Sequence, residues 1–203
     1  MSEEEENPYD VSYAPDEDRE LLPVEYRGSV FRLSNRWKKA IEPIIDQPIT
    51  VLDLYSQQGA NACSLVKTYA THSDSTIYCV DSWNKPLVYS NFLQNITCLS
   101  VEEMNKIHIC RGEVNSMITN RFADDTFDII YLNGLYDKFS LIHMSIQSYK
   151  KCKHGGWIIF NDVQHKEVGT TISFFTSLFV DHIDKIELHS GQVFIQLQKE
   201  NIN

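Results

Sequence analysis

The chain has 203 residues, of which 42% are hydrophobic, and a formal net charge of −10 at pH 7. This length and composition predict one domain with a sizeable core. The negative charge is concentrated in residues 1–20, and the remainder is nearly neutral. Because neither part carries a basic footprint, the composition excludes a typical nucleic-acid-binding protein.

The chain divides into three parts. Residues 1–20 are predicted to be an acidic disordered tail, since like charges and few large apolar residues do not favour folding. An alternative is an acidic arm that docks on a basic partner or shields the mouth of a cofactor site. Residues 21–48 form a lead-in with a helix that begins after Ser34. Residues 49–203 form the main domain.

The five cysteines show no CxxC spacing, and no apolar stretch is long enough to span a membrane. An odd number of scattered cysteines argues for a reducing compartment and against a disulfide framework or a zinc site. We therefore expect a cytoplasmic protein without membrane contact.

Strands and helices alternate along the main domain. Apolar runs predict strands at 49–54, 76–81, 106–110, 127–132 and 157–160. Helical spacing predicts helices at 59–70, 86–96, 114–120, 139–151 and 166–179. This alternation indicates parallel strands, with Gly155-Gly156 as a turn before the fifth.

The last two segments, 183–188 and 193–197, are joined by a short glycine-containing loop, which predicts an antiparallel hairpin. The fold class is therefore α/β, a Rossmann-like doubly wound sheet that is mostly parallel. We expect the apolar face of the helix before the hairpin to pack on the sheet. Any exposed part of that face is a candidate homodimer surface.

Acidic residues end the first two strands. Asp53 is followed by a polar turn that closes at Gly59, and Asp81 ends the second strand. Backbone N–H groups gather at this edge of such a sheet, and an acidic residue after the second strand can accept both hydroxyls of a ribose. The pair favours a ribose-bearing cofactor. The alternative is that both carboxylates cap helices.

Several segments of the domain resemble motifs of the class I S-adenosylmethionine-dependent methyltransferases, in particular small O-methyltransferase-like members. The resemblance covers about residues 45–198 and implies the strand order 3-2-1-4-5-7-6. The segments that carry it are 53–59 (Asp-Leu-Tyr-Ser-Gln-Gln-Gly), 80–83 (Val-Asp-Ser-Trp), 111–116, 127–134 and 155–163.

The resemblance implies S-adenosylmethionine as the cofactor. Asp53 would lie near its methionine part, with the loop from Tyr55 to Gly59 wrapped around it. Asp81 would hold the ribose hydroxyls. The residues implied around the adenine and the methyl-donor end are Ser82 and Trp83 beside the adenine, Glu113 near its amino group, and Asn133 under the methyl group.

Two positions depart from the family pattern. Tyr55 stands where the first motif usually has a glycine, and its ring could fill part of the methionine site. Asn133 stands where metal-using members carry Asp. Together with Asn161 and Asp162 it offers only one formal charge, so no metal site is predicted.

Asp162 and His165 follow the fifth strand and are the candidate catalytic residues. His165 could act as a general base that removes a proton from an acceptor hydroxyl. The alternative is that Asp162 caps the next helix and His165 is an exposed residue at its start. The sequence predicts a methyltransferase acting on a hydroxyl of a small molecule or sugar, or alternatively a catalytically inactive binding or scaffolding module of the same fold.

Overall fold

The computed structural model describes residues 41–44, 46–133, 137–189 and 191–199. They form one seven-stranded sheet with the order β3-β2-β1-β4-β5-β7-β6, which confirms the predicted topology. The strands are β1 (Thr50–Leu54), β2 (Thr76–Asp81), β3 (Ile107–Arg111), β4 (Phe127–Leu132), β5 (Cys152–Phe160), β6 (Ile183–His189) and β7 (Gln192–Leu197). The predicted tail and most of the lead-in lie outside the described residues.

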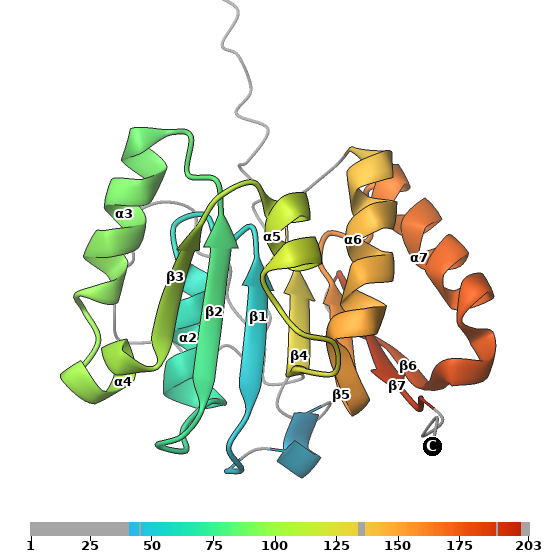
Figure 1. The fold of residues 1–203 in the computed structure, drawn as a ribbon, viewed down its shortest axis with the longest axis horizontal. Coiled ribbons are helices and arrows are strands. Elements are labelled where there is room, and N and C mark those ends of the chain that lie inside the picture. The colour runs from blue at the N-terminus through green and yellow to red at the C-terminus, as the bar shows by residue number, and fades with distance from the viewer. Residues whose placement is uncertain (1–40, 45, 134–136, 190, 200–203) are drawn as a thin grey trace, which may run out of the picture.

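The helices lie on both faces of this sheet, with α2 behind it and α5 and α6 in front (Figure 1). They are α2 (Ala60–Thr68), α3 (Pro86–Ile96), α4 (Val101–Asn105), α5 (Val114–Asn120), α6 (Lys138–Lys151) and α7 (Lys166–Leu178), with 3₁₀ turns η1 (Glu42–Ile44) and η2 (Val180–His182). None of the described helices is both long and apolar enough to span a membrane.

Each strand serves two cores because successive side chains point to opposite faces. Val51 packs in the core beneath α2 and α3, where Phe92 is fully buried. Leu52, the next residue, packs in the core beneath α5, α6 and α7 with Phe175. Strands buried on both faces explain why β1 and β4 are mostly apolar, each with one aspartate.

Two local predictions were wrong. Gly155 and Gly156 lie inside β5, which begins at Cys152, and do not form a turn before it. Gly155 has a φ of 75°, and β5 changes register against β4 beside it. Helix α4 was not predicted because it buries none of its side chains; a capping box between Ser100 and Glu103 begins it instead.

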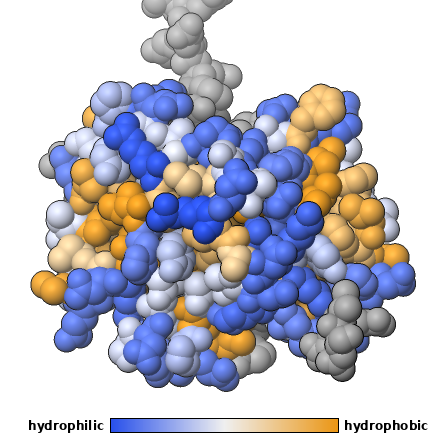
Figure 2. Space-filling view, in the orientation of Figure 1, coloured by the Kyte–Doolittle hydropathy of each residue, from blue (hydrophilic) through white to orange (hydrophobic). Residues whose placement is uncertain are grey.

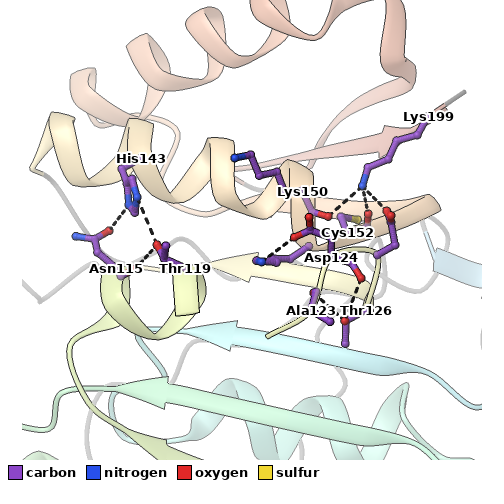
Figure 3. A network of polar contacts seen from close by, with 11 residues as sticks. Asn115, Thr119, Ala123, Asp124, Thr126, His143, Lys150, Cys152 and Lys199 are labelled. Atoms are coloured by element: carbon purple, nitrogen blue, oxygen red, sulfur yellow. Dashed lines mark hydrogen bonds and ion pairs between the residues drawn. The ribbon is translucent and has the colours of Figure 1, made fainter. Parts of the chain in front are cut away.

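Lys199, which follows β7, joins the loop before β4, the end of α6 and the start of β5 at the amino edge of the parallel strands. Lys199 Nζ donates to Asp125 Oδ1 at 2.7 Å and to the carbonyls of Lys150 and Cys152 (Figure 3). At the same edge, Asp128 Oδ2 accepts from Thr50 N at 2.8 Å. These contacts all lie at the amino edge, whereas the polar loops described below lie at the carboxyl edge.

The apolar face of α7 is only partly covered. Phe175 is buried, whereas Phe174 and Leu178 are 42% and 51% exposed. Figure 2 shows apolar residues over α6 and α7 on the right flank of the molecule, where Phe139 is also exposed. The homodimer surface stays a prediction. All five cysteines are free, and Cys98 alone among them is exposed.

Candidate functional site

The loop after β1 has an unusual backbone. The φ angles of Tyr55, Gln57 and Gly59 are 60°, 46° and 79°, so every second residue is left-handed. For a residue with a side chain this conformation costs about 1–2 kcal/mol. Gly59 alone of the three is suited to it, and a Cβ there would lie 2.7 Å from Phe92 Cδ2. Two residues of this loop, Tyr55 and Gln57, thus adopt a backbone conformation that normally favours glycine.

Asp81 holds this loop in place. Its Oδ2 accepts from Gln57 N at 2.9 Å, and its Oδ1 accepts from Trp83 N at 2.8 Å. Trp83 Nε1 in turn donates to Gln57 O at 2.6 Å. Hydrogen bonds to a carboxylate are stronger than those between neutral groups, and they offset the strain of the left-handed residues. The second strand and the first loop therefore form one rigid unit.

Aromatic and cationic side chains support that unit. The indole of Trp83 is buried and packs on Tyr89 and Phe92, with ring centroids 5.3 and 4.6 Å away. Arg111 Nη2 donates to Trp83 O at 3.2 Å, and its Nε donates to Ser82 O at 3.4 Å. The tryptophan thus supports the loop from the core, while Ser82 is half-buried beside it.

Asp53 is fully buried at the end of β1. Both of its carboxylate oxygens lack a hydrogen-bond partner among the described residues, as do Asn61 Oδ1 and Gln58 Oε1. Burial raises the pKa of Asp53 to about 7 because desolvation disfavours the charged form. The segment from β1 to α2 therefore holds four buried acceptor atoms without donors, an arrangement that a ligand rich in N–H or O–H groups would complete.

Side-chain amides form a chain across the ends of β4, β5 and β7. Gln192 Nε2 donates to Asn161 Oδ1 at 3.2 Å, Asn161 Nδ2 to Asn133 Oδ1 at 3.0 Å, and Asn133 Nδ2 to Tyr55 O at 3.3 Å. Both asparagine oxygens already accept a hydrogen bond, and neither side chain is charged. This donor set does not fit a hard divalent cation, which prefers carboxylate oxygens.

The candidate catalytic residues share the turn after β5. His165 N donates to Asp162 O at 2.9 Å, and Asp162 has a φ of 56°. His165 occupies the N-cap position of α7 and is exposed, so Asp162 is not the capping residue. Burial raises the pKa of Tyr131 well above its usual value, and the nearby charges of Asp53 and Asp162 add to the rise. Asp162 therefore lies close to the buried polar residues.

Two further side chains near the sheet edge cap or join helices. The carboxylate of Glu113 caps α5, accepting from Asn115 N at 3.0 Å and from Ser116 N at 2.6 Å. His143 lies between α6 and α5, with Nδ1 3.2 Å from Asn115 Oδ1 and Nε2 3.5 Å from Thr119 Oγ1 (Figure 3). The structure thus gives Glu113 a capping contact, and its role toward the adenine stays a prediction.

Four residues of this site were not predicted from the sequence: Gln57, Gln58, Asn61 and Gln192. Gln192 had a readable signal, because the first residue of an antiparallel last strand lies at the carboxyl edge of the parallel strands. Gln57, Gln58 and Asn61 had none, since their contribution depends on the left-handed loop and on burial at the start of α2.

Comparison with solved structures identifies the fold. The O-methyltransferase TomG from Streptomyces achromogenes, solved with S-adenosylmethionine, superposes with a TM-score of 0.63 at 10% identity, over 84% of this chain and 82% of that one. The chain has the class I methyltransferase fold. No protein-family model matches its sequence, and no curated protein does.

Other structures with this fold differ widely in what they act on. Methyltransferase PaMTH1 from Podospora anserina, solved with S-adenosylhomocysteine, has a TM-score of 0.63 at 12% identity, covering 84% of this chain and 80% of that one. A ribosomal protein L11 methylase from Lactobacillus delbrueckii has a TM-score of 0.54 at 16% identity, covering 80% and 76%. The fold therefore leaves the acceptor open.

Proposed function

We propose that this chain is an S-adenosylmethionine-dependent methyltransferase that methylates a hydroxyl of a small molecule. The observation that carries the proposal is the group of buried acceptors around Asp53, at the edge of the sheet where ligands bind in open α/β folds. The cofactor carries an ammonium group, whose N–H groups could donate hydrogen bonds to these oxygens. The fold and the acidic end of β2 support the same conclusion.

Asp81 has acceptor lone pairs left with which it could bind the hydroxyls of a ribose. Each of its carboxylate oxygens has two lone pairs and accepts one backbone N–H in the structure. Each oxygen can therefore accept one further hydrogen bond, as the two ribose hydroxyls require. Ser82 lies beside Asp81 and is proposed to flank the adenine.

The acceptor side is proposed to use protein groups without a metal. When bound, S-adenosylmethionine would supply a methyl group on a sulfonium: the acceptor oxygen would bond to the methyl carbon in line as the methyl–sulfur bond breaks and S-adenosylhomocysteine leaves. His165 is exposed at the start of α7 and is proposed to take the proton from the acceptor hydroxyl, with Asp162 in the same turn. The near-neutral domain suits a small acceptor more than a nucleic acid.

Calorimetric titration with S-adenosylmethionine and S-adenosylhomocysteine tests the proposal. We expect a dissociation constant on the order of micromolar for the wild-type protein and a loss of at least about tenfold in Asp81→Asn. Asp74→Asn, which changes an exposed carboxylate on a loop, is the matched control and should bind like the wild type. Folded wild-type protein that binds neither compound would contradict the proposal.

A second candidate is a binding or scaffolding module that has this fold and lacks catalysis. The observation that favours it is that non-glycine residues occupy two of the three left-handed positions of the cofactor loop. This candidate tolerates a closed cofactor site, whereas the methyltransferase does not. Absence of cofactor binding in the same titration would therefore favour this candidate.

A further inference from the structure

We infer that the side chain of Tyr55 is a gate over the ribose end of the cofactor site and must move aside before S-adenosylmethionine binds. This inference rests on the proposed function. Tyr55 stands at a position where the first motif of class I methyltransferases usually has a glycine. The inferred gate is therefore specific to this chain and is not a general feature of the fold.

The backbone of Tyr55 is fixed from two sides. Its N–H donates to Val80 O at 2.8 Å, in β2, and its carbonyl accepts from Asn133 Nδ2 at 3.3 Å, after β4. With a φ of 60°, the residue leaves the direction of β1 at this point. The backbone is therefore held, and movement of the gate falls to side-chain rotation.

The side chain lies where the proposed ligand contacts converge. It is half-buried and packs against the core of the α5–α6 face. Burial raises the pKa of Tyr55 to about 12, and the charges of Glu113, Asp81 and Asp137 add to the rise. Two of these carboxylates, at the start of α5 and the end of β2, are the ones proposed for the adenine and the ribose. The backbone contacts with Val80, which precedes Asp81, and with Asn133 place Tyr55 between the positions proposed for the ribose and the methyl group.

A gate that is closed most of the time lowers the apparent affinity, because only the open fraction of the protein is competent to bind. Replacing the tyrosine by glycine removes the ring and suits the left-handed backbone. The gate therefore predicts that Tyr55→Gly binds the cofactor more tightly than the wild-type protein, whereas a merely structural tyrosine predicts weaker or equal binding.

The test is calorimetric titration of wild-type, Tyr55→Gly and Tyr55→Phe proteins with S-adenosylhomocysteine, alongside thermal unfolding of each. We expect Tyr55→Gly to bind at least about tenfold more tightly, and Tyr55→Phe, which keeps the ring, to stay within about threefold of the wild type. Asp46→Gly is the matched control: Asp46 also has a left-handed φ, of 69°, and is exposed in the loop before β1. It relieves the backbone but loses the hydrogen bond from Thr71 Oγ1 to Asp46 Oδ1 at 3.2 Å, and it should keep wild-type affinity.

The outcomes separate the gate from the function. Binding by the wild type that Tyr55→Gly does not tighten overturns the gate and leaves the proposed function standing. Binding by Tyr55→Gly alone supports the ring as the group that closes the site, and it overturns the proposed function of the wild-type chain. Folded proteins of which neither binds overturn both.

Discussion

Asp53 is a carboxyl group in a place that disfavours its charge. Its pKa is about 7 in the folded protein against an ordinary value of 3.8. Between these two values the folded state binds more protons than the unfolded state, so stability falls as the pH rises from about 4 to about 7. A residue that weakens the fold at neutral pH is expected where function, not stability, requires the carboxylate.

Asp53→Asn removes this penalty while keeping the shape of the side chain. At pH 8 we expect the free energy of unfolding to exceed that of the wild type by a few kcal/mol, about 4 at most for a shift of this size. The gain should shrink as the pH falls and vanish near pH 4, where the wild-type carboxyl is protonated in the folded state. Urea denaturation at pH 4.5, 6 and 8 measures it, and a gain independent of pH would contradict the argument.

The start of α2 depends on contact between one glycine and one aromatic ring. Gly59 is left-handed and would place a Cβ 2.7 Å from Phe92 Cδ2. Phe92 is fully buried and packs against Trp83 and Tyr89, so it has no room to move away. The first turn of α2, which carries Asn61, is thereby set at a fixed distance from α3.

Gly59→Ala should therefore lower the stability of the fold for two reasons: alanine is strained at this φ, and its Cβ would clash with Phe92. Gly155→Ala is the matched control, because Gly155 has nearly the same φ, 75°, and an added Cβ meets nothing within 4 Å. We expect a loss of about 1 kcal/mol for the control and about 2–4 kcal/mol for Gly59→Ala, measured by denaturant unfolding. Equal losses of stability in the two variants would show that the clash with Phe92 does not contribute to the loss.

The sequence could predict the elements that obey simple patterns. Helices α3 and α5 and strand β4 match their predicted bounds, because Pro86 starts one and apolar spacing marks the others. The longer start of β5 could not be predicted, since of its first five residues only Cys152 pairs with β4, and the register shift that contains the left-handed Gly155 has no local signal.

The site was predictable only in part, for a similar reason. The ends of β1 and β2 placed Asp53 and Asp81 at one edge of the sheet. The sequence does not show that Asp81 already accepts two backbone N–H groups, or that Gln192 joins Asn161 from 31 residues away. Both facts depend on tertiary packing, which local patterns do not encode.

The contacts of Lys199 and the candidate site lie at opposite edges of the sheet. The strand ends that carry Asp53 and Asp81 form one edge, while Lys199 and Asp125 join elements at the other. Lys199 Nζ also lies 4.9 Å from the centre of the Tyr149 ring. The end of β7, the start of β5 and α6 are thus held by a single ammonium group far from the site.

Lys199→Met tests this separation, since it keeps much of the side chain and removes the charge. The carbonyls of Lys150 and Cys152 and the carboxylate of Asp125 then lose a donor, and we expect stability to fall by about 1–3 kcal/mol. Lys150→Met, which changes an exposed lysine of the same region, should alter stability by less than about 0.5 kcal/mol. Affinity for S-adenosylhomocysteine should stay unchanged in both proteins, because neither substitution touches the loop from Tyr55 to Gly59. An affinity that falls together with stability would show that the two edges of the sheet are coupled.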